Sequence, residues 1–328
     1  YTIVERDHHG RFQYSDSMQA KLDIQFKPLV DVYRQWLGGQ LERLGVSIPG
    51  RMWDEKSWSV AITHDIDFVE TRKRSRLKSF GQGSISRAFA NMGKRDRRRV
   101  SLFRLKAAEV ARKVTATYFF KGGASSSEDV QYDLMKPWLR EFLENLVVSG
   151  FEVSLHPSYA AYDHPKLLRS EYEALTRIVG SCRNSVRTQF LRWVEPTTPR
   201  LLGQAGFHID SSLGFSQHEG FRRATCHPFR LFDISANQPL DLWELPLAVM
   251  DTTLFGHRGL SVEEAMVQIR ALFNSVKQVG GCAVLLWHNT VDDEQAFPGQ
   301  AQVFEETLDN AMLEGACVGS LKDVMQHY

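Results

Sequence analysis

The stretch from Trp58 to Asp67, Trp-Ser-Val-Ala-Ile-Thr-His-Asp-Ile-Asp, constrains the fold more than any other part of the sequence. Residues 59–63 predict a strand buried on both faces, which is typical of a central strand in a parallel sheet. The strand ends abruptly at His64, Asp65 and Asp67. Carboxylates are costly to bury unless they bind a metal or a proton, and ligands of α/β folds bind at such strand ends. A helix N-cap explains one Asp here but not two, so the stretch indicates a functional site.

Strand-like and helix-like segments alternate along the rest of the chain. Further strands are predicted at 114–120, 151–156, 185–193, 207–211, 242–251 and 282–288. Helical spacing of apolar residues predicts helices at 26–44, 100–112, 130–149, 165–179, 199–205, 262–279, 301–313 and 321–325. This alternation is typical of a parallel sheet with right-handed crossovers, and seven strands favour a barrel over an open sheet.

Charge is distributed unevenly along the chain. The net charge is +1, but residues 72–106 contain thirteen Lys and Arg and one acidic residue, a local charge of +12. We interpret this segment as a basic insertion after the first strand, which is either solvated or a surface for an anionic partner such as a membrane or a diphosphate carrier. Few aromatic residues interleave the charges, which argues against nucleic acid. The expected organisation is an N-terminal extension, 1–56, packed on a barrel domain, 57–328.

The four cysteines show neither a CxxC pair nor close spacing. This argues against a zinc–thiolate or redox motif and mildly favours a reducing compartment. No apolar run approaches the ~18 residues that a membrane span requires. We therefore expect a cytoplasmic protein, with peripheral membrane contact through 72–106 as an open alternative.

Polar residues recur where the predicted strands end. Because the carboxyl ends of parallel strands meet at one mouth of a barrel, these side chains are expected to converge there. They are Asp65, Asp67, His156, Arg187, Arg192, Asp210, Asp251 and His288.

The order of the motifs resembles the polysaccharide deacetylase family (NodB homology, carbohydrate esterase family 4). The similar stretches, in family order across residues 57–290, are Thr63-His-Asp-Ile-Asp67, Ala116-Thr-Tyr-Phe-Phe120, His156-Pro-Ser-Tyr, the surroundings of Arg187, and Leu286-Trp-His288. Together they are most similar to a divergent branch found with bacterial surface-polysaccharide genes. The resemblance implies a distorted (β/α)7-type barrel. It also implies a hydrolase that removes an N-acetyl, less often an O-acetyl, group from a sugar in polysaccharide or lipopolysaccharide biosynthesis.

Carried over by position, the resemblance implies a role for each polar residue. Asp65 would be the general base and His288 the general acid that protonates the departing amine. Asp67 and His156 would be ligands of a divalent metal, zinc. Because Ile66 separates carboxylates that the family places side by side, the base and the ligand could be exchanged.

The third metal ligand is open. The second His of the family motif would fall at Ala160, which cannot coordinate an ion. His164 and Gln189 are the candidate replacements, although zinc prefers Cys, His and carboxylates over Gln. This departure leaves a second hypothesis, a catalytically impaired homologue that binds a glycan or a lipid-linked sugar.

Several further residues complete the predicted site. Arg187, or else Arg192, would hold Asp65 ionised. A long loop is predicted at 214–233. Residues 210–215 and 220–228 predict a substrate lid in which Arg222 favours an anionic or phosphorylated sugar, unless it only pairs with acidic residues. The candidate substrate-binding residues are Arg192, Asp210, Arg222, Asp251 and Trp287.

Overall fold

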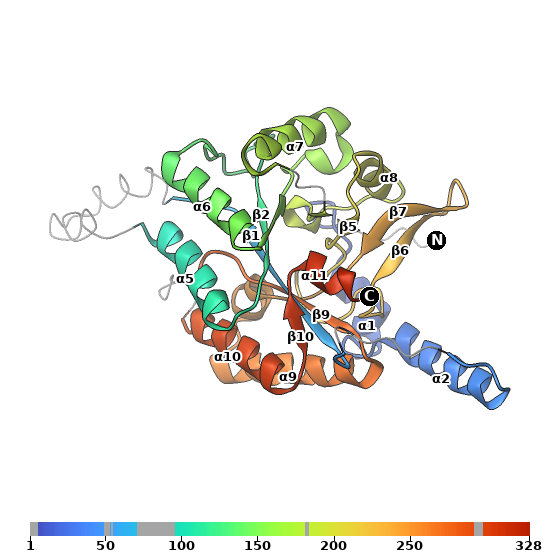
Figure 1. Cartoon of the computed structure of the whole chain (residues 1–328). Helices are drawn as coiled ribbons and strands as arrows, with labels where there is room; N and C mark the ends of the chain where they lie inside the picture. The colour runs from blue at the N-terminus through green and yellow to red at the C-terminus, as the bar shows by residue number, and fades with distance from the viewer. Residues whose placement is uncertain (1–5, 49–52, 54, 71–95, 181–183, 292–297) are drawn as a thin grey trace.

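The structure is a computed structural model that describes residues 6–48, 53, 55–70, 96–180, 184–291 and 298–328. These residues form one ten-stranded sheet that curls into half a barrel (Figure 1). The strand order is β6-β7-β5-β4-β3-β2-β1-β9-β8, and β10 pairs with β1. The strands are β1 (Ser59–Ile66), β2 (Thr117–Phe120), β3 (Glu152–Leu155), β4 (Ser185–Val186), β5 (Ile209–Asp210), β6 (Phe229–Asp233), β7 (Gln238–Glu244), β8 (Leu247–Met250), β9 (Cys282–Leu286) and β10 (Cys317–Gly319).

Most of the helices lie around the outside of the curled sheet, but the last helix contributes Leu321 and Val324 to the core inside the curl (Figure 1). They are α1 (Met18–Lys21), α2 (Leu29–Arg43), α5 (Arg97–Ala111), α6 (Pro137–Val148), α7 (Pro165–Val179), α8 (Thr197–Gln204), α9 (Val262–Val279), α10 (Gln300–Leu313) and α11 (Leu321–Gln326). Short helical turns are η1 (Tyr14–Asp16), η2 (Ala161–Asp163), η3 (Gln189–Leu191) and η4 (Thr252–His257).

Strand β1 lies at the centre of the sheet, as its apolar sequence predicts. It runs parallel to β9 along one edge and to β10 and then β2 along the other. Because side chains of a strand alternate between faces, Val60 and Ile62 enter the core between sheet and helices, while Ala61 enters the core inside the curl. Because β1 is buried on both faces, only its polar C-terminal end reaches the mouth of the barrel.

The α/β barrel class is confirmed, but the strands differ in number and direction from the prediction. Residues 229–233, predicted as the end of a long loop, form β6, which pairs with β7 as the antiparallel hairpin of the sheet. A further short strand, β10, was not predicted. The predicted strand at 185–193 ends after Val186, because the chain turns through η3, where Phe190 and Leu191 adopt left-handed backbone angles.

The N-terminal part of the described chain projects from the body at α2 (Figure 1). Asp31 of this helix is buried and accepts hydrogen bonds from the Cys226 backbone N–H at 2.8 Å and the Thr225 hydroxyl at 2.9 Å. Many apolar side chains of the predicted helix at 26–44 stay exposed, among them Trp36 at 62%.

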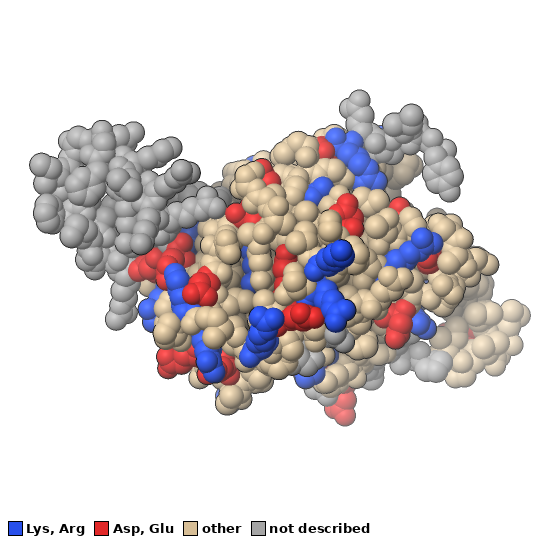
Figure 2. Space-filling model, turned by 90° about the horizontal axis from the view of Figure 1, so that it is seen from above, with Lys and Arg blue, Asp and Glu red and all other residues tan. Residues whose placement is uncertain are grey.

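Most of the basic insertion, residues 72–95, lies outside the described residues. On the face shown in Figure 2, Lys and Arg lie beside Asp and Glu and do not form a patch of one sign. Among the described helices, none is long and apolar enough to cross a membrane.

Candidate active site

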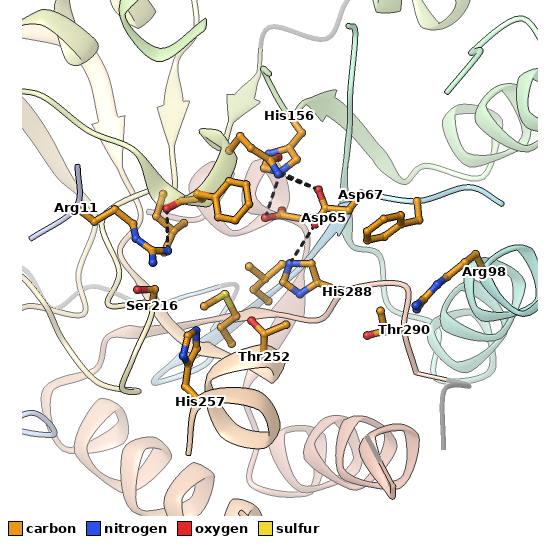
Figure 3. A pocket seen from close by; sticks show the side chains of 16 residues that line it. Arg11, Asp65, Asp67, Arg98, His156, Ser216, Thr252, His257, His288 and Thr290 are labelled. Atoms are coloured by element: carbon orange, nitrogen blue, oxygen red, sulfur yellow. Dashed lines mark hydrogen bonds and ion pairs between the residues drawn. The ribbon is translucent and has the colours of Figure 1, made fainter. Parts of the chain in front are cut away.

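A cavity of about 370 Å³ lies at the carboxyl ends of the parallel strands. Asp65 reaches it from β1, Asp67 from the residue after β1, His156 from the residue after β3, and His288 from just beyond β9 (Figure 3). Gln189 of η3 also lines it. The structure therefore brings together the four residues that the sequence predicted at the core of the site.

Asp65 is held by a buried arginine. Nη1 of Arg187 donates to Asp65 Oδ1 at 3.1 Å and to the Thr63 hydroxyl at 2.7 Å. The same guanidinium donates to the carbonyl and the hydroxyl of Ser211 and lies over the ring of Phe119. Arg187 is fully buried, so its charge is balanced within the protein by Asp65. This pair keeps Asp65 oriented, with Oδ2 toward His156.

Asp67 lies among cationic and amide groups. Its Oδ1 is 3.2 Å from the Lys121 ammonium and accepts a hydrogen bond from Gln189 Nε2 at 3.2 Å. Burial favours the neutral acid, but the charge of Lys121 and the nearby His156 and His288 outweigh burial and lower the pKa of Asp67 below its usual value. Asp67 is therefore a carboxylate at neutral pH.

His156 is oriented by the backbone of the neighbouring strand end. Its Nδ1–H donates to the Arg187 carbonyl at 2.6 Å, so Nε2 faces Asp65 Oδ2 and Asp67 Oδ1, each at 3.8 Å. Burial lowers the pKa of His156 below its usual value, although the two carboxylates oppose that shift. The ring is therefore neutral, with the Nε2 lone pair directed at the carboxylates.

His288 forms a dyad with Asp251, which directly follows β8. The ring Nδ1–H donates to Asp251 Oδ1 at 2.6 Å, and the backbone N–H of His288 donates to Oδ2 at 2.8 Å. Burial disfavours the charged ring, but Asp251 and then Asp67 and Asp65 raise the pKa of His288 to about 9. Nε2 is 3.8 Å from Asp67 Oδ2. The imidazolium therefore points a proton into the cavity.

The other predicted substrate-binding residues do not line this cavity. The Arg192 guanidinium donates to the His9 and Tyr159 carbonyls and stacks on Tyr159. Arg222 donates to the Gly214 carbonyl. Trp287 is fully buried in the core, and its indole N–H donates to the Gln300 carbonyl.

Asp210 and Glu244 form a buried carboxyl pair away from the cavity. Burial raises the pKa of Asp210, and burial together with the Asp210 charge raises that of Glu244 well above its usual value. Two carboxyl groups in contact share a proton, so the surroundings of Asp210 indicate a structural role and not substrate binding. His164 is exposed at the start of α7 and does not line the cavity.

The sequence analysis missed several residues that line or support the cavity. Arg11, Arg98 and His257 line it, and Lys121 contacts Asp67 from behind. Lys121 directly follows β2, so the strand-end rule that selected His156 would also have selected it. Arg11 carried no comparable signal, because it comes from the irregular N-terminal region.

The donor atoms do not fit a zinc ion with three protein ligands. Zinc bound at 2.0–2.2 Å in tetrahedral geometry holds two donors roughly 3.4 Å apart. Asp67 Oδ1 and His156 Nε2, at 3.8 Å, are near that spacing, so the misfit comes from the groups that already contact Asp67. The Asp67 oxygen already contacts Lys121 and Gln189, and Gln189 turns its amide N–H, not its oxygen, toward it. Within the described residues, no group of three or more His, Cys, Asp or Glu side chains is arranged to hold a metal ion.

Comparison with known proteins supports the fold. No family model matches the sequence, and no curated protein matches it. The structure is similar to that of a protein assigned as a polysaccharide deacetylase from Mycobacterium smegmatis, with a TM-score of 0.58, 23% identity, and coverage of 86% of this chain and 92% of that one.

Two further solved structures are similar at lower TM-scores. The chitin deacetylase from Colletotrichum lindemuthianum gives a TM-score of 0.45 at 15% identity, covering 85% of this chain and 91% of that one. BA3943, a carbohydrate esterase family 4 pseudoenzyme from Bacillus anthracis, gives 0.45 at 9% identity, covering 81% and 65%. On the first of the three comparisons and on its own strand order, this chain has the fold of the polysaccharide deacetylases.

Proposed function

We propose that the protein removes an acetyl group, N-linked or less often O-linked, from a sugar of polysaccharide or lipopolysaccharide biosynthesis. The observation that carries the proposal is one cavity lined by an oriented base and an oriented acid. Asp65 is fixed by Arg187, and His288 is fixed and kept protonated by Asp251. The fold supports the same proposal, because the family that the motifs resemble uses this fold for deacetylation.

The two groups divide the proton transfers of amide hydrolysis between them. A water oxygen attacks the acetyl carbonyl carbon, and Asp65 takes the proton that this water loses. When the C–N bond breaks, the His288 Nε2–H gives its proton to the departing amine, and acetate is released. Acid–base assistance of this kind contributes typically 10²–10⁴-fold to the rate.

Zinc, which the resemblance implies, would have Asp67 and His156 as its protein ligands, with Gln189 at the third position. That donor set does not fit the ion as the residues stand, so the steps above use only groups of the protein. Asp67 therefore acts through its charge, since its carboxylate lies between the rings of His156 and His288.

The test is acetate release from N-acetylated hexosamines, followed by NMR, with the purified protein in chelator and again with added zinc. We expect the native protein to release acetate. Asp65→Asn should release it at least about 100-fold more slowly, because the amide cannot accept the proton of the attacking water. Asp133→Asn, a change at an exposed residue that does not line the cavity, is the control and should retain the native rate. Equal rates for native protein and Asp65→Asn would refute the assignment of the base.

A second function, sugar binding without turnover, is favoured by a specific observation. The Lys121 ammonium contacts the carboxylate that the family would use for its metal, and Ala160 stands where the family has a ligand. In this case the native protein binds the sugar in a calorimetric titration but releases no acetate, in chelator or with zinc.

The cavity wall also favours an anionic sugar. Arg11 lines the cavity beside His257, and burial and the Arg11 charge together lower the pKa of His257. Arg11 is anchored by Asp7 at 2.7 Å and by the Phe190 carbonyl at 3.3 Å, so its position is fixed. A fixed guanidinium is suited to a phosphate or carboxylate, including that of a lipid-diphosphate-linked sugar.

Arg11→Gln is expected to weaken binding of a phosphorylated N-acetylhexosamine by about tenfold and to leave the neutral sugar unchanged, since it removes a charge that only the anion uses. Titration calorimetry of both sugars at low salt measures this difference. Arg140→Gln, an exposed change on α6, is the control. Equal weakening for both sugars would instead indicate damage to the cavity through the Asp7 contact.

A further inference from the structure

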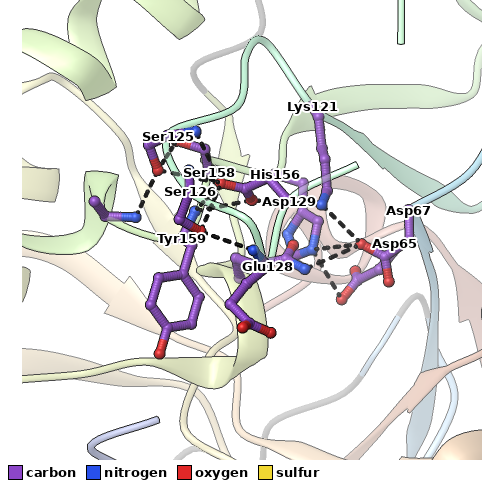
Figure 4. Close-up of polar contacts among 12 residues, drawn as sticks. Asp65, Asp67, Lys121, Ser125, Ser126, Glu128, Asp129, His156, Ser158 and Tyr159 are labelled. Atoms are coloured by element: carbon purple, nitrogen blue, oxygen red, sulfur yellow. Dashed lines mark hydrogen bonds and ion pairs between the residues drawn. The ribbon is translucent and has the colours of Figure 1, made fainter. Parts of the chain in front are cut away.

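Lys121 is a buried cation placed at the back of the cavity. It follows β2 directly, is only 2% exposed, and its Nζ is 3.2 Å from Asp67 Oδ1 and 3.6 Å from Asp129 Oδ1 (Figure 4). Nζ makes no hydrogen bond of good geometry to either carboxylate. Its contribution to the site is therefore its charge.

The turn after β2 fixes the position of this charge. Gly122 passes so close to Glu171 that a Cβ there would collide with the backbone of Glu171. The chain then leads to Asp129, whose carboxylate accepts hydrogen bonds from the backbone N–H groups of Ser125 and Tyr159. Because Asp129 is committed to the loop, Lys121 is left to balance Asp67.

The Asp67 oxygen that faces His156 is thus already used by groups of the protein. Lys121 and Gln189 both approach Oδ1, and the Gln189 side-chain oxygen is buried without a hydrogen-bond partner. A divalent cation at this oxygen would meet the buried ammonium at short range, and like charges this close repel.

We propose that Lys121 serves as a built-in cation that takes the place of a divalent ion at Asp67 and excludes such an ion from the cavity. The ammonium lies 3.2 Å from Asp67 Oδ1 and places a positive charge there, which is part of what a bound metal would do at the same oxygen. The inference concerns the cavity of the proposed function but does not depend on deacetylation.

Removing the ammonium should open a metal site, because the remaining groups are ligands that zinc accepts. Asp67 Oδ1 and Asp65 Oδ2 each lie 3.8 Å from His156 Nε2, so a closure of a few tenths of an ångström suffices. Lys121→Met keeps the length of the side chain and its apolar stem while removing the charge.

The experiment is a zinc titration at pH 7.5 in competition with a chromophoric chelator, without any sugar. We expect Lys121→Met to bind one equivalent at least about tenfold more tightly than the native protein. This gain should vanish in Lys121→Met/His156→Ala, since His156 is the ligand that defines the site. Lys136→Met, which removes a half-buried lysine paired with Glu70, should behave as the native protein.

Two results would overturn the proposal. One is a gain in Lys121→Met that persists without His156, which would place the ion elsewhere. The second result needs no Lys121 variant. If the native protein binds one equivalent of zinc tightly and His156→Ala abolishes this binding, Lys121 does not exclude the ion. If Lys121→Met fails to fold, this native comparison decides alone. Absence of acetate release would refute the proposed function and leave the titration unaffected.

Discussion

Replacing His288 with glutamine is expected to lower the rate of acetate release by 10²–10⁴-fold, about 3–5 kcal/mol of transition-state free energy. The glutamine amide takes roughly the place of Nε2 in the cavity, but it has no acidic proton to give to the departing amine. The loss should appear in kcat with little change in KM, because the proton moves only in the transition state. Steady-state kinetics with an N-acetylated sugar measure it.

The control for this change is His208→Gln, which alters an exposed histidine outside the cavity and should leave the rate unchanged. A His288→Gln protein with more than a tenth of the native kcat would contradict the role of His288 as the acid. Water would then be the proton donor, and the hydrogen bond between His288 and Asp251 would have a structural role.

The raised pKa of His288 sets the pH range of this activity. The folded-state pKa is about 9, above the ordinary value of 6.5, because Asp251 stabilises the charged ring. The stabilising contribution of this pair is therefore complete below pH ~6.5 and is lost as the pH rises through about 9. Activity should fall over the same upper range, as the ring loses the proton that it donates.

Replacing Arg187 with methionine is expected to lower the free energy of unfolding by about 3–5 kcal/mol. The substitution leaves Asp65 as a buried charge without its cation and removes three hydrogen-bonded partners of the guanidinium, namely Thr63 and both groups of Ser211. Denaturant unfolding followed by circular dichroism, with the slope of the transition checked against the native protein, measures the loss.

A matched exposed arginine and a double variant test the cause. Arg140 pairs with Glu144 on the surface of α6, so Arg140→Met should change stability by less than ~1 kcal/mol. Adding Asp65→Asn to Arg187→Met should restore part of the lost stability, because the buried charge is removed with its partner. If the double variant is as unstable as the sum of the two single changes, packing around Arg187, and not the charge of Asp65, is responsible.

The strand-end pattern predicted much of this site. A run that is buried on both faces must lie inside the sheet, and parallel strands place their carboxyl ends together, so Asp65, His156 and His288 could be expected at one mouth. The order of motifs also predicted the deacetylase fold. The antiparallel hairpin of β6 and β7 was missed, because 229–233 lacks a continuous apolar run and its buried and exposed side chains are mixed.

The sequence by itself therefore determined which residues end the strands and that a curled α/β sheet would gather them. Only the tertiary structure decided which of them touch. Asp251 meets His288 because β8 lies beside β9, and Lys121 meets Asp67 because β2 lies beside β1. Local periodicity fixes the face of a strand on which a side chain lies, whereas pair distances follow from strand order and register, which depend on the packing of the whole chain.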